Sequence, residues 1–364
     1  MLLIYISLVI CFLYFILIIL FIIGWKRISI FVPSGRKSKS LTVSVIVVCK
    51  NEEEHLRSLL SCLAQQSYQD FELVVVNDHS TDSTPQIMES AEKAFSKIQI
   101  INSIGHGKKA ALKEAVESAN GDLIITTDGD CLPSFHWIET ITCYYRKNPC
   151  DLMICPVKLN KKETLFSKLQ SLEFTSLVAS GGAAAGIGMP ILCNGANLAF
   201  KKKTWLKNQA HLHEEEQSGD DIFLLQSIKK RGGKIRFLKS ESAFVYTDPA
   251  ESFAAFFKQR QRWAAKSPTY TDWQLIFTAC IVFVISVLPF VLIGFSIENE
   301  KIWNVLLFVT VFKYMMDGLF LYSVRDFFQL QYVWFYALIL SIIYPFYIVY
   351  TAISALVIKP KTWK

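Results

Sequence analysis

The sequence lacks the cysteine pattern of a zinc module or a dithiol redox site. Its nine cysteines include no Cys-x-x-Cys pair and no Cys/His cluster with the spacing of zinc ligands. Cys49, Cys62 and Cys155 fall in apolar surroundings, so we expect them to pack, reduced, in the core of a cytoplasmic domain. The sequence also lacks an internal repeat, a low-complexity tract and a nucleic-acid-binding module. A nucleic-acid partner is therefore not expected.

A soluble protein is not expected either, because long apolar stretches lie towards both ends of the chain. Hydrophobic residues make up 52% of the 364 residues and are unevenly spread. Residues 1–25 are almost continuously apolar, and 273–357 contains three more stretches of the roughly 20 residues that a spanning helix needs. These three predicted spans are 273–296, 302–324 and 332–357. The middle of the chain, 41–250, is long enough for one catalytic domain.

The charges beside the first apolar run predict the orientation of the chain. No basic residue precedes this run and no small-x-small cleavage site follows it, so we expect a retained helix and not a cleaved signal. Basic residues stay cytoplasmic, and several follow the run directly: Lys26, Arg27, Arg36, Lys37 and Lys39. The amino terminus is thus expected outside and the middle domain inside. Three later spans would put the lysine-rich tail, 358–364, outside against the same rule, whereas a break at Pro345 would return it to the cytoplasm.

Two charged residues interrupt the predicted span 302–324. Lys313 and Asp317 are four residues apart, which places them on one face of a helix. Charges inside a membrane often mark a functional pathway, and they also occur as structural ion pairs between helices. Both interpretations stay open from the sequence.

Strands and helices alternate through the first half of the middle domain. Apolar runs predict strands at 43–48, 71–76, 98–101 and 122–126, and helical periodicity covers 51–66, 82–95 and 108–118. This alternation is typical of a parallel sheet with helices on both faces, an α/β fold. Ligands bind such sheets at the carboxyl ends of the strands, which is where Asp78 and Asp128 fall.

The second half of the domain is less regular. We expect helices at 165–179 and 221–231, the latter capped by Ser218 or Asp220. Short strands are expected at 197–200, 235–238 and 243–247, and the Gly/Ala-rich segment 180–189 is expected to be a flexible loop or a close-packed turn.

Acidic residues supply the candidate chemistry. Asp128 and Asp130 flank a glycine and could hold Mg2+ or Mn2+ against a diphosphate, although many Asp-x-Asp pairs are only solvated turns. Asp78 could accept a hydrogen bond from a base or a ribose.

Asp221 is the candidate general base, whereas Asp220 is readily explained as a helix cap. His211 and His213 are weaker candidates in a charged loop, and Lys109, beside Lys108 at a helix start, could approach phosphate.

A segment rich in glutamine and arginine precedes the last apolar stretches. Gln259, Arg262 and Trp263 are spaced i, i+3 and i+4, so an amide, a guanidinium and an indole share one face of a helix. Arginine grips phosphate with a planar fork and tryptophan offers a stacking surface. The alternative is an amphipathic helix over 251–268 that lies in the membrane interface, with Phe253, Phe256 and Phe257 as its apolar stripe.

In this order, a lone Asp, an Asp-x-Asp, an acidic pair and a Gln-x-x-Arg-Trp resemble the signature of membrane-integrated family 2 glycosyltransferases. That family includes cellulose, chitin and hyaluronan synthases, Nod-factor chitin-oligomer synthases and, more loosely, ceramide glucosyltransferases. The resemblance covers residues 41–266 and extends to one apolar helix before the domain and several after it. The Gly-Asp-Asp at 219–221 resembles hyaluronan synthases and departs from cellulose synthases.

The resemblance implies a GT-A fold, a UDP-sugar donor and transfer with inversion to a lipid or glycan acceptor. It implies that Asp78 holds uridine, that Asp128 and Asp130 hold UDP and metal, and that Asp221 is the base. The Gln259, Arg262 and Trp263 set would cradle the diphosphate and the acceptor. The segment containing Cys193 and Gly195 would lie on the acceptor side, as would Asp220. The few membrane segments favour a lipid or short oligomer over an extruded polymer. A transporter or flippase that only binds nucleotide remains a third interpretation.

Overall fold

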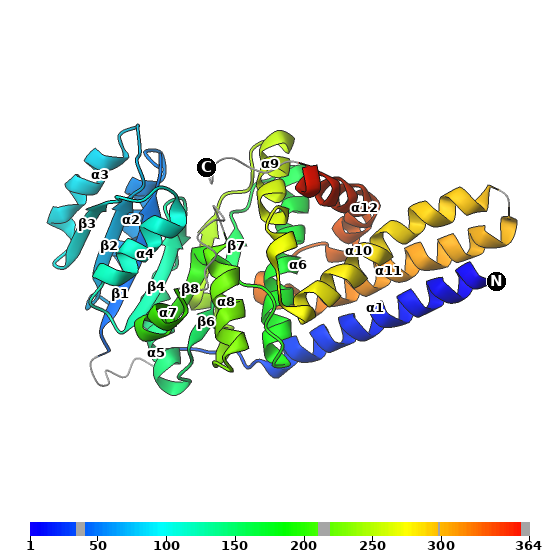
Figure 1. The fold of residues 1–364 in the computed structure, drawn as a ribbon, viewed down its shortest axis with the longest axis horizontal. Helices are drawn as coiled ribbons and strands as arrows, with labels where there is room; N and C mark the ends of the chain where they lie inside the picture. The colour runs from blue at the N-terminus through cyan, green and yellow to red at the C-terminus, as the bar shows by residue number, and fades with distance from the viewer. Residues whose placement is uncertain (34–40, 210–218, 298, 358–364) are drawn as a thin grey trace. The chain divides into compact units, whose positions relative to one another are not determined.

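The computed structural model describes residues 1–33, 41–209, 219–297 and 299–357, which form two compact units. One unit, the sheet unit, comprises 28–160 and 190–249. The other, the helical unit, comprises 1–27, 161–189 and, among the described residues, 250–297 and 299–357. Both are drawn in Figure 1. Each unit is described by itself.

A seven-stranded mixed sheet forms the centre of the sheet unit, in the order β3-β2-β1-β4-β8-β6-β9. Strands β3, β2, β1 and β4 are parallel, β8 is antiparallel to both of its neighbours, and β9 is parallel to β6. The bounds are β1 Val43–Cys49, β2 Glu72–Asn77, β3 Ile98–Asn102, β4 Leu123–Asp128, β6 Leu152–Ile154, β8 Leu198–Lys201 and β9 Ile235–Phe237. Every residue of β1 is buried, as expected of an apolar strand covered on both faces.

A second, three-stranded sheet has the order β5-β10-β7. Its strands are β5 Leu132–Pro133, β7 Val157–Leu159 and β10 Val245–Thr247. Helices of the unit are α2 Leu56–Ala64, α3 Thr84–Ser90, α4 Lys108–Ser118, α5 Trp137–Lys147, α7 Lys202–Asn208 and α8 Asp220–Lys230. The predicted α/β fold is therefore confirmed.

Short strands at 132–133, 152–154 and 157–159, and helix α5, were absent from the sequence prediction. The strands have three residues or fewer, which is too short for a period of two to show. Helix α5 combines threonine and isoleucine, which favour strands, with a buried face of Trp137, Ile138, Ile141 and Tyr144. A helix over 82–95 was expected, and the structure has only α3 followed by a 3-10 turn at Ala91–Ala94.

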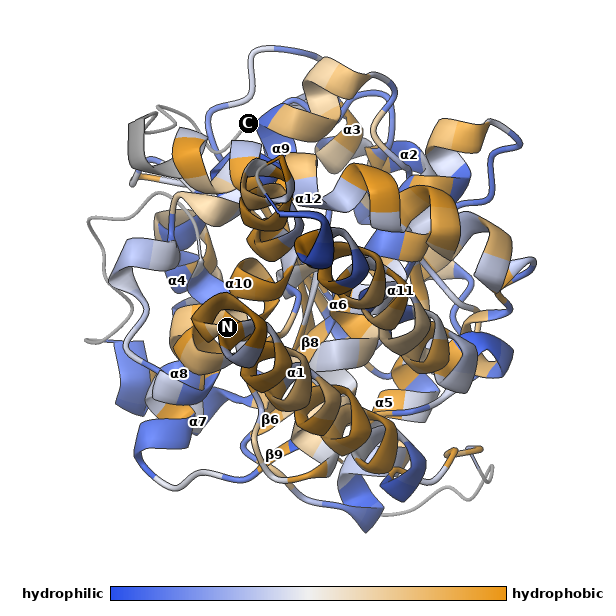
Figure 2. Cartoon of the chain, turned by 90° about the vertical axis from the view of Figure 1, so that its right-hand side faces the viewer, coloured by the Kyte–Doolittle hydropathy of each residue, from blue (hydrophilic) through white to orange (hydrophobic). Residues whose placement is uncertain are grey.

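Six helices make up the described part of the helical unit. They are α1 Leu2–Arg27, α6 Leu165–Gly186, α9 Phe253–Ala264, α10 Trp273–Ser296, α11 Glu300–Phe328 and α12 Val333–Val357. Four of these, α1, α10, α11 and α12, are long and apolar enough to cross a membrane. Figure 2 shows α1 and α11 as hydrophobic along most of their length.

The prediction of a loop or turn at 180–189 was wrong, because helix α6 continues to Gly186. Small residues allow two helices to approach closely, which offsets the weak helix propensity of glycine. A Cβ added at Gly24 of α1 would lie only 2.0 Å from the carbonyl oxygen of Ala183 on α6. Packing against α1 therefore explains why this Gly/Ala-rich segment stays helical. It also places α6 in the helical unit, although it lies within the predicted catalytic range 41–250.

The predicted break at Pro345 was also wrong, because α12 runs through this proline to Val357. Proline removes one helical hydrogen bond, which apolar spanning helices tolerate when neighbouring groups satisfy the freed carbonyl. The tail at 358–364 lies outside the described residues.

The expectation that Phe253, Phe256 and Phe257 form one stripe facing the membrane interface was wrong for Phe256, which is only 9% exposed. Its ring packs within the protein, 5.9 Å from that of Phe166 and 5.5 Å from that of Tyr347. Phe253 is exposed, so only part of the stripe faces outward.

Candidate active site

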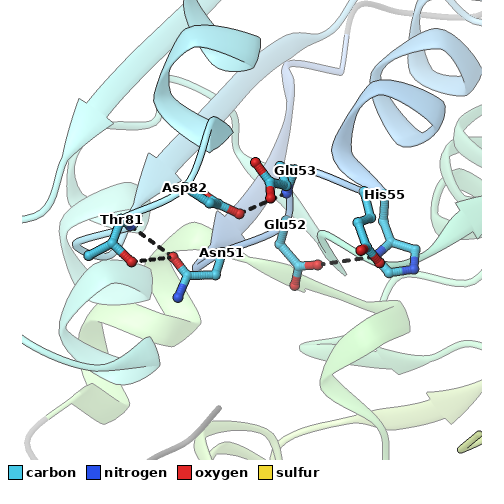
Figure 3. A pocket seen from close by; sticks show the side chains of 7 residues that line it. Asn51, Glu52, Glu53, His55, Thr81 and Asp82 are labelled. Carbon is cyan, nitrogen blue, oxygen red and sulfur yellow. Dashed lines mark hydrogen bonds and ion pairs between the residues drawn. The ribbon is translucent and has the colours of Figure 1, made fainter.

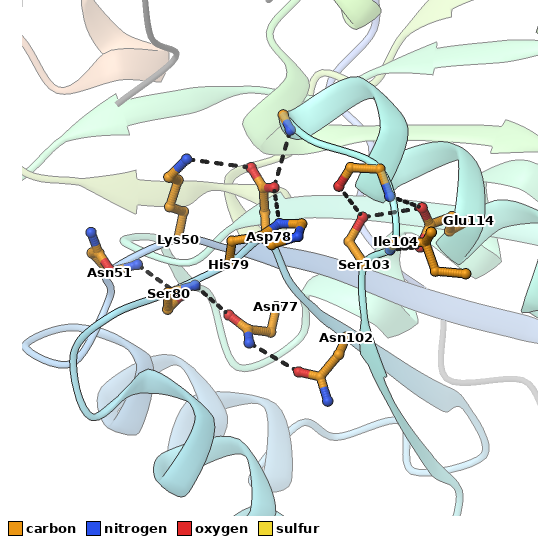
Figure 4. Close-up of polar contacts among 12 residues, drawn as sticks. Lys50, Asn51, Asn77, Asp78, His79, Ser80, Asn102, Ser103, Ile104 and Glu114 are labelled. Atoms are coloured by element: carbon orange, nitrogen blue, oxygen red, sulfur yellow. Dashed lines mark hydrogen bonds and ion pairs between the residues drawn. The ribbon is translucent and has the colours of Figure 1, made fainter.

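Asp78 is fully buried just after β2, at the carboxyl edge of the parallel strands. Its Oδ1 accepts a hydrogen bond from the Gly107 backbone N–H at 3.0 Å and lies 3.1 Å from His79 Nδ1. Its Oδ2 lies 3.9 Å from the Lys50 ammonium, as Figure 4 shows. The position after a strand end is the one predicted. The contacts hold a carboxylate in a fixed orientation directly in front of helix α4.

Glu114 of α4 shapes the loop that reaches Asp78. Its carboxylate accepts hydrogen bonds from the backbone N–H groups of Ile104 and Gly105 and from the Ser103 hydroxyl, at 3.1, 2.9 and 3.1 Å (Figure 4). Burial alone would raise the pKa of Glu114, but the two N–H groups outweigh it and the pKa is lowered. Gly107 ends this loop at φ 93°, a conformation that suits glycine and turns its N–H towards Asp78.

Two histidines that the sequence interpretation passed over lie beside Asp78. The rings of His79 and His106 stack with centroids 4.1 Å apart. Together with Asp78 they place one possible ligand atom each within 4.8 Å of the others, the only such trio in the part of the chain that the structure describes. Imidazole nitrogens suit Zn2+, whereas Mg2+ and Mn2+ prefer oxygen. In the sequence, His79 directly follows the predicted site residue Asp78, and His106 directly precedes Gly107 at the start of α4.

Lys108, the first residue of α4, gathers three of the predicted acids. Its ammonium lies 2.5 Å from Asp128 Oδ1, and its side chain is 17% exposed. Burial alone would lower the pKa of Lys108, but the carboxylates of Asp128, Asp220 and Asp221 outweigh it and raise that pKa well above its ordinary value. The acids at the end of β4 and at the start of α8 therefore both act on the charge of Lys108. An all-oxygen set that already attracts a cation fits the chemistry of Mg2+ or Mn2+.

Asp130, the second carboxylate of the Asp-x-Asp, is exposed. Its Oδ1 lies 3.5 Å from the thiol of buried Cys131, which donates to it. Burial and the charges of Asp130 and Asp128 raise the pKa of that thiol. Cys131 is therefore held protonated beside the two acids.

Asp220 and Asp221 open helix α8 next to the segment predicted to lie on the acceptor side. Asp221 Oδ2 accepts a hydrogen bond from the Gly195 N–H at 3.0 Å, and its Oδ1 accepts one from the Ile222 N–H at 2.8 Å. A Cβ added at Gly195 would lie 3.7 Å from Asp220 Oδ2. Gly195 is tied to β4 as well, because the Thr126 hydroxyl donates to its carbonyl at 3.0 Å. Cys193, two residues earlier, is partly exposed.

The predicted cap of this helix was wrong for Asp220. The capping residue is Gly219, at φ 97°, and no side chain caps the helix, so Asp220 belongs to the first helical turn. The charge of its carboxylate raises the pKa of Lys108. Ser218, His211 and His213 lie outside the described residues.

Lys109 is placed differently from the neighbouring Lys108. Its ammonium lies 4.7 Å from the ring centroid of Phe223 on α8, a cation–π contact. Successive helical residues point about 100° apart, so the two lysines extend in different directions from the start of α4.

The loops that follow β1 and β2 line a pocket (Figure 3). Asn51 Oδ1 accepts from the Thr81 N–H at 2.8 Å, and Asp82 Oδ2 accepts from the Glu53 N–H at 3.1 Å. These bonds join the loop that follows β1 to the loop that follows β2, which begins at Asp78. The lining is mostly acidic: Glu52, Glu53, Glu54 and Asp82, with Asn51, His55 and Thr81.

Gln259, Arg262 and Trp263 lie on α9 of the helical unit. Gln259 Oε1 accepts a hydrogen bond from Arg260 Nη1 at 2.7 Å, and the ring of Trp263 lies 4.2 Å from the guanidinium carbon of Arg260. Arg262 is partly exposed in the last turn. Arg260, which the sequence interpretation left aside, is thus the buried centre of this motif.

Comparison with known proteins relates the sequence to a glycosyltransferase family. Residues 44–206 match the family model described as Glycosyl transferase family 2. The chain is similar to the poly-β-1,6-N-acetyl-D-glucosamine synthase of Staphylococcus epidermidis, at 22% identity over 227 residues, which is 61% of this chain and 53% of that protein. The enzyme of the same name from Staphylococcus aureus strain COL is 22% identical over 228 residues, again 61% and 53%. The chain therefore spans about half the length of the curated relatives it matches.

Among solved structures, the chain resembles the mannosyltransferase PcManGT from Pyrobaculum calidifontis, determined in complex with GDP-Man and Mn2+. The TM-score is 0.58 at 15% identity, and the match covers 97% of this chain and 99% of that one. At this identity the likeness concerns the fold. The chain therefore contains a glycosyl transferase family 2 domain, matched over residues 44–206, and its mixed α/β sheet is of the GT-A type.

Proposed function

We propose that the chain is an inverting glycosyltransferase that moves a sugar from a UDP-sugar to a lipid or growing glycan at the cytoplasmic membrane face. One observation supports this most directly. The Lys108 ammonium lies 2.5 Å from Asp128 Oδ1, the charges of Asp220 and Asp221 also raise its pKa, and Asp78 lies at the same edge of the sheet. Acids gathered around a cation are what a site for a metal-bound diphosphate requires.

Each predicted residue has a role in this proposal. Asp78 accepts a hydrogen bond from the donor base, and the Lys108 ammonium is placed to meet the diphosphate. Asp128 and Asp130 would hold Mg2+ or Mn2+, which neutralises charge on the departing diphosphate. Gln259, Arg262 and Trp263 bind the diphosphate and the acceptor, while Cys193, Gly195 and Asp220 lie on the acceptor side.

Asp221 is the proposed base. Its two backbone hydrogen bonds orient the carboxylate, which takes the proton of the acceptor hydroxyl. The acceptor oxygen then bonds to the anomeric carbon as the bond from that carbon to the diphosphate breaks. The nucleotide leaves with the bonding electrons, so the sugar is transferred with inversion and no covalent enzyme intermediate forms.

The membrane location belongs to the same proposal. Four helices of suitable length and composition support an integral membrane protein. Lys26 and Arg27, in the last turn of α1, support a cytoplasmic position for the residues that follow, by the positive-inside rule.

The first test is donor turnover by the full chain in lipid nanodiscs with Mg2+ or Mn2+. The relatives are named for poly-N-acetylglucosamine, so UDP-N-acetylglucosamine is the first donor, with UDP-glucose and GDP-mannose for comparison. We expect release of UDP that depends on the metal and on a lipid extract. Absence of nucleotide release from every donor and extract would exclude the proposal.

Two versions differ in the product. The relatives are named as synthases of a polymer, which supports a processive synthase as the alternative, whereas the small membrane portion favours a lipid or short oligomer. Product sizing by gel or mass spectrometry separates them. A ladder of long chains would establish the processive version, and a single added sugar would establish the other.

Replacing the base tests the assigned chemistry. We expect Asp221→Asn to lower UDP release about 100-fold or more, because general base catalysis contributes roughly that factor, while UDP binding measured by calorimetry stays unchanged. Asp220→Asn is the matched control and is expected to have the smaller effect on turnover. Wild-type turnover in Asp221→Asn would refute the assignment.

A further inference from the structure

A buried ion pair joins helices α6 and α9 inside the helical unit. Glu173 of α6 and Arg260 of α9 are both 4% exposed, and Arg260 Nη2 donates to Glu173 Oε2. Removing one partner of a buried pair leaves an uncompensated charge, which is strongly unfavourable. The pair is therefore a fixed link between the two helices.

Further hydrogen bonds surround this link. The Tyr347 hydroxyl of α12 donates to Glu173 Oε1 at 3.3 Å. One turn earlier on α6, the Gln170 amide exchanges two hydrogen bonds with the backbone of Ala250, both at 3.0 Å. Helix α9 and the residues that lead into it are thus held by α6 and α12, which agrees with the neighbouring positions of α6, α9 and α12 in Figure 1.

The Arg260 guanidinium directly contacts Gln259 and Trp263, which are predicted to bind the sugar donor and the acceptor substrate. One of its nitrogens donates to Gln259 at 2.7 Å, and its carbon lies 4.2 Å from the Trp263 ring centroid and 4.6 Å from that of Phe256. A planar guanidinium can stack on rings while its edge donates hydrogen bonds, and an ammonium cannot do both. Trp263 also packs against Phe174, the neighbour of Glu173, with ring centroids 6.3 Å apart.

We propose that Glu173 and Arg260 are positioning residues, which hold Gln259 and Trp263 in the orientation that transfer requires. Neither residue needs to touch the substrate, because Glu173 fixes Arg260 and Arg260 fixes the amide and the indole. The inference rests on the proposed function for its kinetic consequence. A misplacement of about 1 Å can cost roughly 100-fold in rate, which is the scale of the expected effect.

The test compares wild type, Glu173→Gln, Glu173→Asp and Arg260→Lys, each as full chain in nanodiscs. We expect kcat for UDP release to fall about 10- to 100-fold, while the Kd for UDP, measured by calorimetry, changes less than about threefold. Glu173→Asp keeps the charge and is the variant most certain to fold. Glu163→Gln is the matched control, because Glu163 pairs with Lys168 at 2.8 Å but its side chain is 91% exposed.

A second measurement does not depend on turnover. Hydrogen exchange of the peptide over 253–264 reports the order of α9 in the same samples. We expect faster exchange in Glu173→Gln and Arg260→Lys than in wild type, and no change in Glu163→Gln. If wild type turns over no donor, the proposed function fails, and the exchange data still decide the link between α6 and α9.

Three results would overturn the inference. One is wild-type kcat together with wild-type exchange of α9 in folded Glu173→Asp and Arg260→Lys. The other is an equal loss of kcat in Glu163→Gln, which would show that any charge change on this segment suffices. A loss of kcat with intact exchange would also contradict it, since the proposed effect acts through the placement of α9.

Discussion

At the scale of single residues, Lys108 links acids from two distant parts of the sequence. Its ammonium lies 2.5 Å from Asp128 Oδ1, and the charges of Asp220 and Asp221 also raise its pKa. We expect Lys108→Ala to lower UDP release about 10- to 100-fold and to lower the melting temperature of the metal-free protein, because the acids would then repel one another. Added Mn2+ should restore part of that melting temperature.

Lys97→Ala is the control for this prediction, because Lys97 pairs with Asp70 at 2.8 Å and both side chains are exposed. Differential scanning fluorimetry with and without Mn2+ measures the effect on stability, and nucleotide release measures the effect on turnover. An equal loss in Lys97→Ala would show that removal of any lysine charge has this effect.

The four acidic and aromatic motifs could be read from the sequence, since each is a short pattern of chemically distinct residues. Lys108 and Arg260 could not be distinguished in this way. Each has a basic neighbour within two positions, Lys109 or Arg262, and only the direction of the side chain on its helix separates them. The convergence of Gln259, Arg262 and Trp263 with the acids of the sheet unit stays a prediction.

At the scale of elements, Glu114 links α4 to the loop in front of it. Its pKa is lowered in the folded chain, so its hydrogen bonds stabilise the loop above the ordinary glutamate pKa of about 4.3 and are lost as the pH falls through the lowered value. We expect Glu114→Gln to speed amide exchange at Ile104 and Gly105 at neutral pH by about fivefold, the equivalent of about 1 kcal/mol.

Below the lowered pKa this difference between wild type and variant should vanish, because the wild-type side chain is then neutral as well. Glu117→Gln on the exposed side of the same helix is the control and should exchange like wild type. A difference that stays constant from neutral to acidic pH would show that charge on Glu114 is not the cause.

Helix α1 packs against α6 through Gly24. Because a Cβ at this position would overlap the Ala183 carbonyl, we expect Gly24→Ala to destabilise the helical unit by about 1–3 kcal/mol. Gly294→Ala on α10 is the matched control, since nothing lies within 4 Å of a Cβ there. Thermal unfolding in detergent compares the two, and equal melting temperatures would contradict the close approach of α1 and α6.

The elements that the sequence predicted correctly are those with long, regular patterns. Strands β1 to β4 are runs of valine and isoleucine, and α4 begins and ends where the sequence placed it, at Lys108 and Ser118. Helix α6 was cut short in the prediction because glycine and alanine are ambiguous. Glycine weakens a helix exposed to water, whereas small residues favour a helix packed closely against another, and only the position of α1 decides between these outcomes.

At the scale of the whole molecule, the charges of Lys313 and Asp317 in the predicted span 302–324 help to decide between a transferase and a transporter. Lys313 lies 2.6 Å from Asp317, and the Tyr14 hydroxyl of α1 donates to the same carboxylate. The Lys313 ammonium also lies 5.1 Å from the Tyr344 ring centroid on α12. An ion pair enclosed by three helices favours the structural interpretation over a transport pathway.

We therefore expect Lys313→Met and Asp317→Asn each to destabilise the protein by about 3–5 kcal/mol, and the double variant to be less destabilised than either. Melting temperatures of the wild type, the two single variants and the double variant, measured in nanodiscs, test this expectation. Nucleotide release per folded molecule should be unchanged in the double variant. Loss of that activity in a stable double variant would favour a functional pathway instead.

The order of the two units along the chain has a practical consequence for producing the protein. The chain leaves the sheet unit after residue 160 and re-enters it at 190, having contributed α6 to the other unit. A truncated protein covering 28–249 would thus carry α6 without α1, α9 and α12, and its apolar surface would promote aggregation. Replacing 161–189 by a short glycine-serine linker should yield a soluble form of the sheet unit suited to crystallisation with nucleotide.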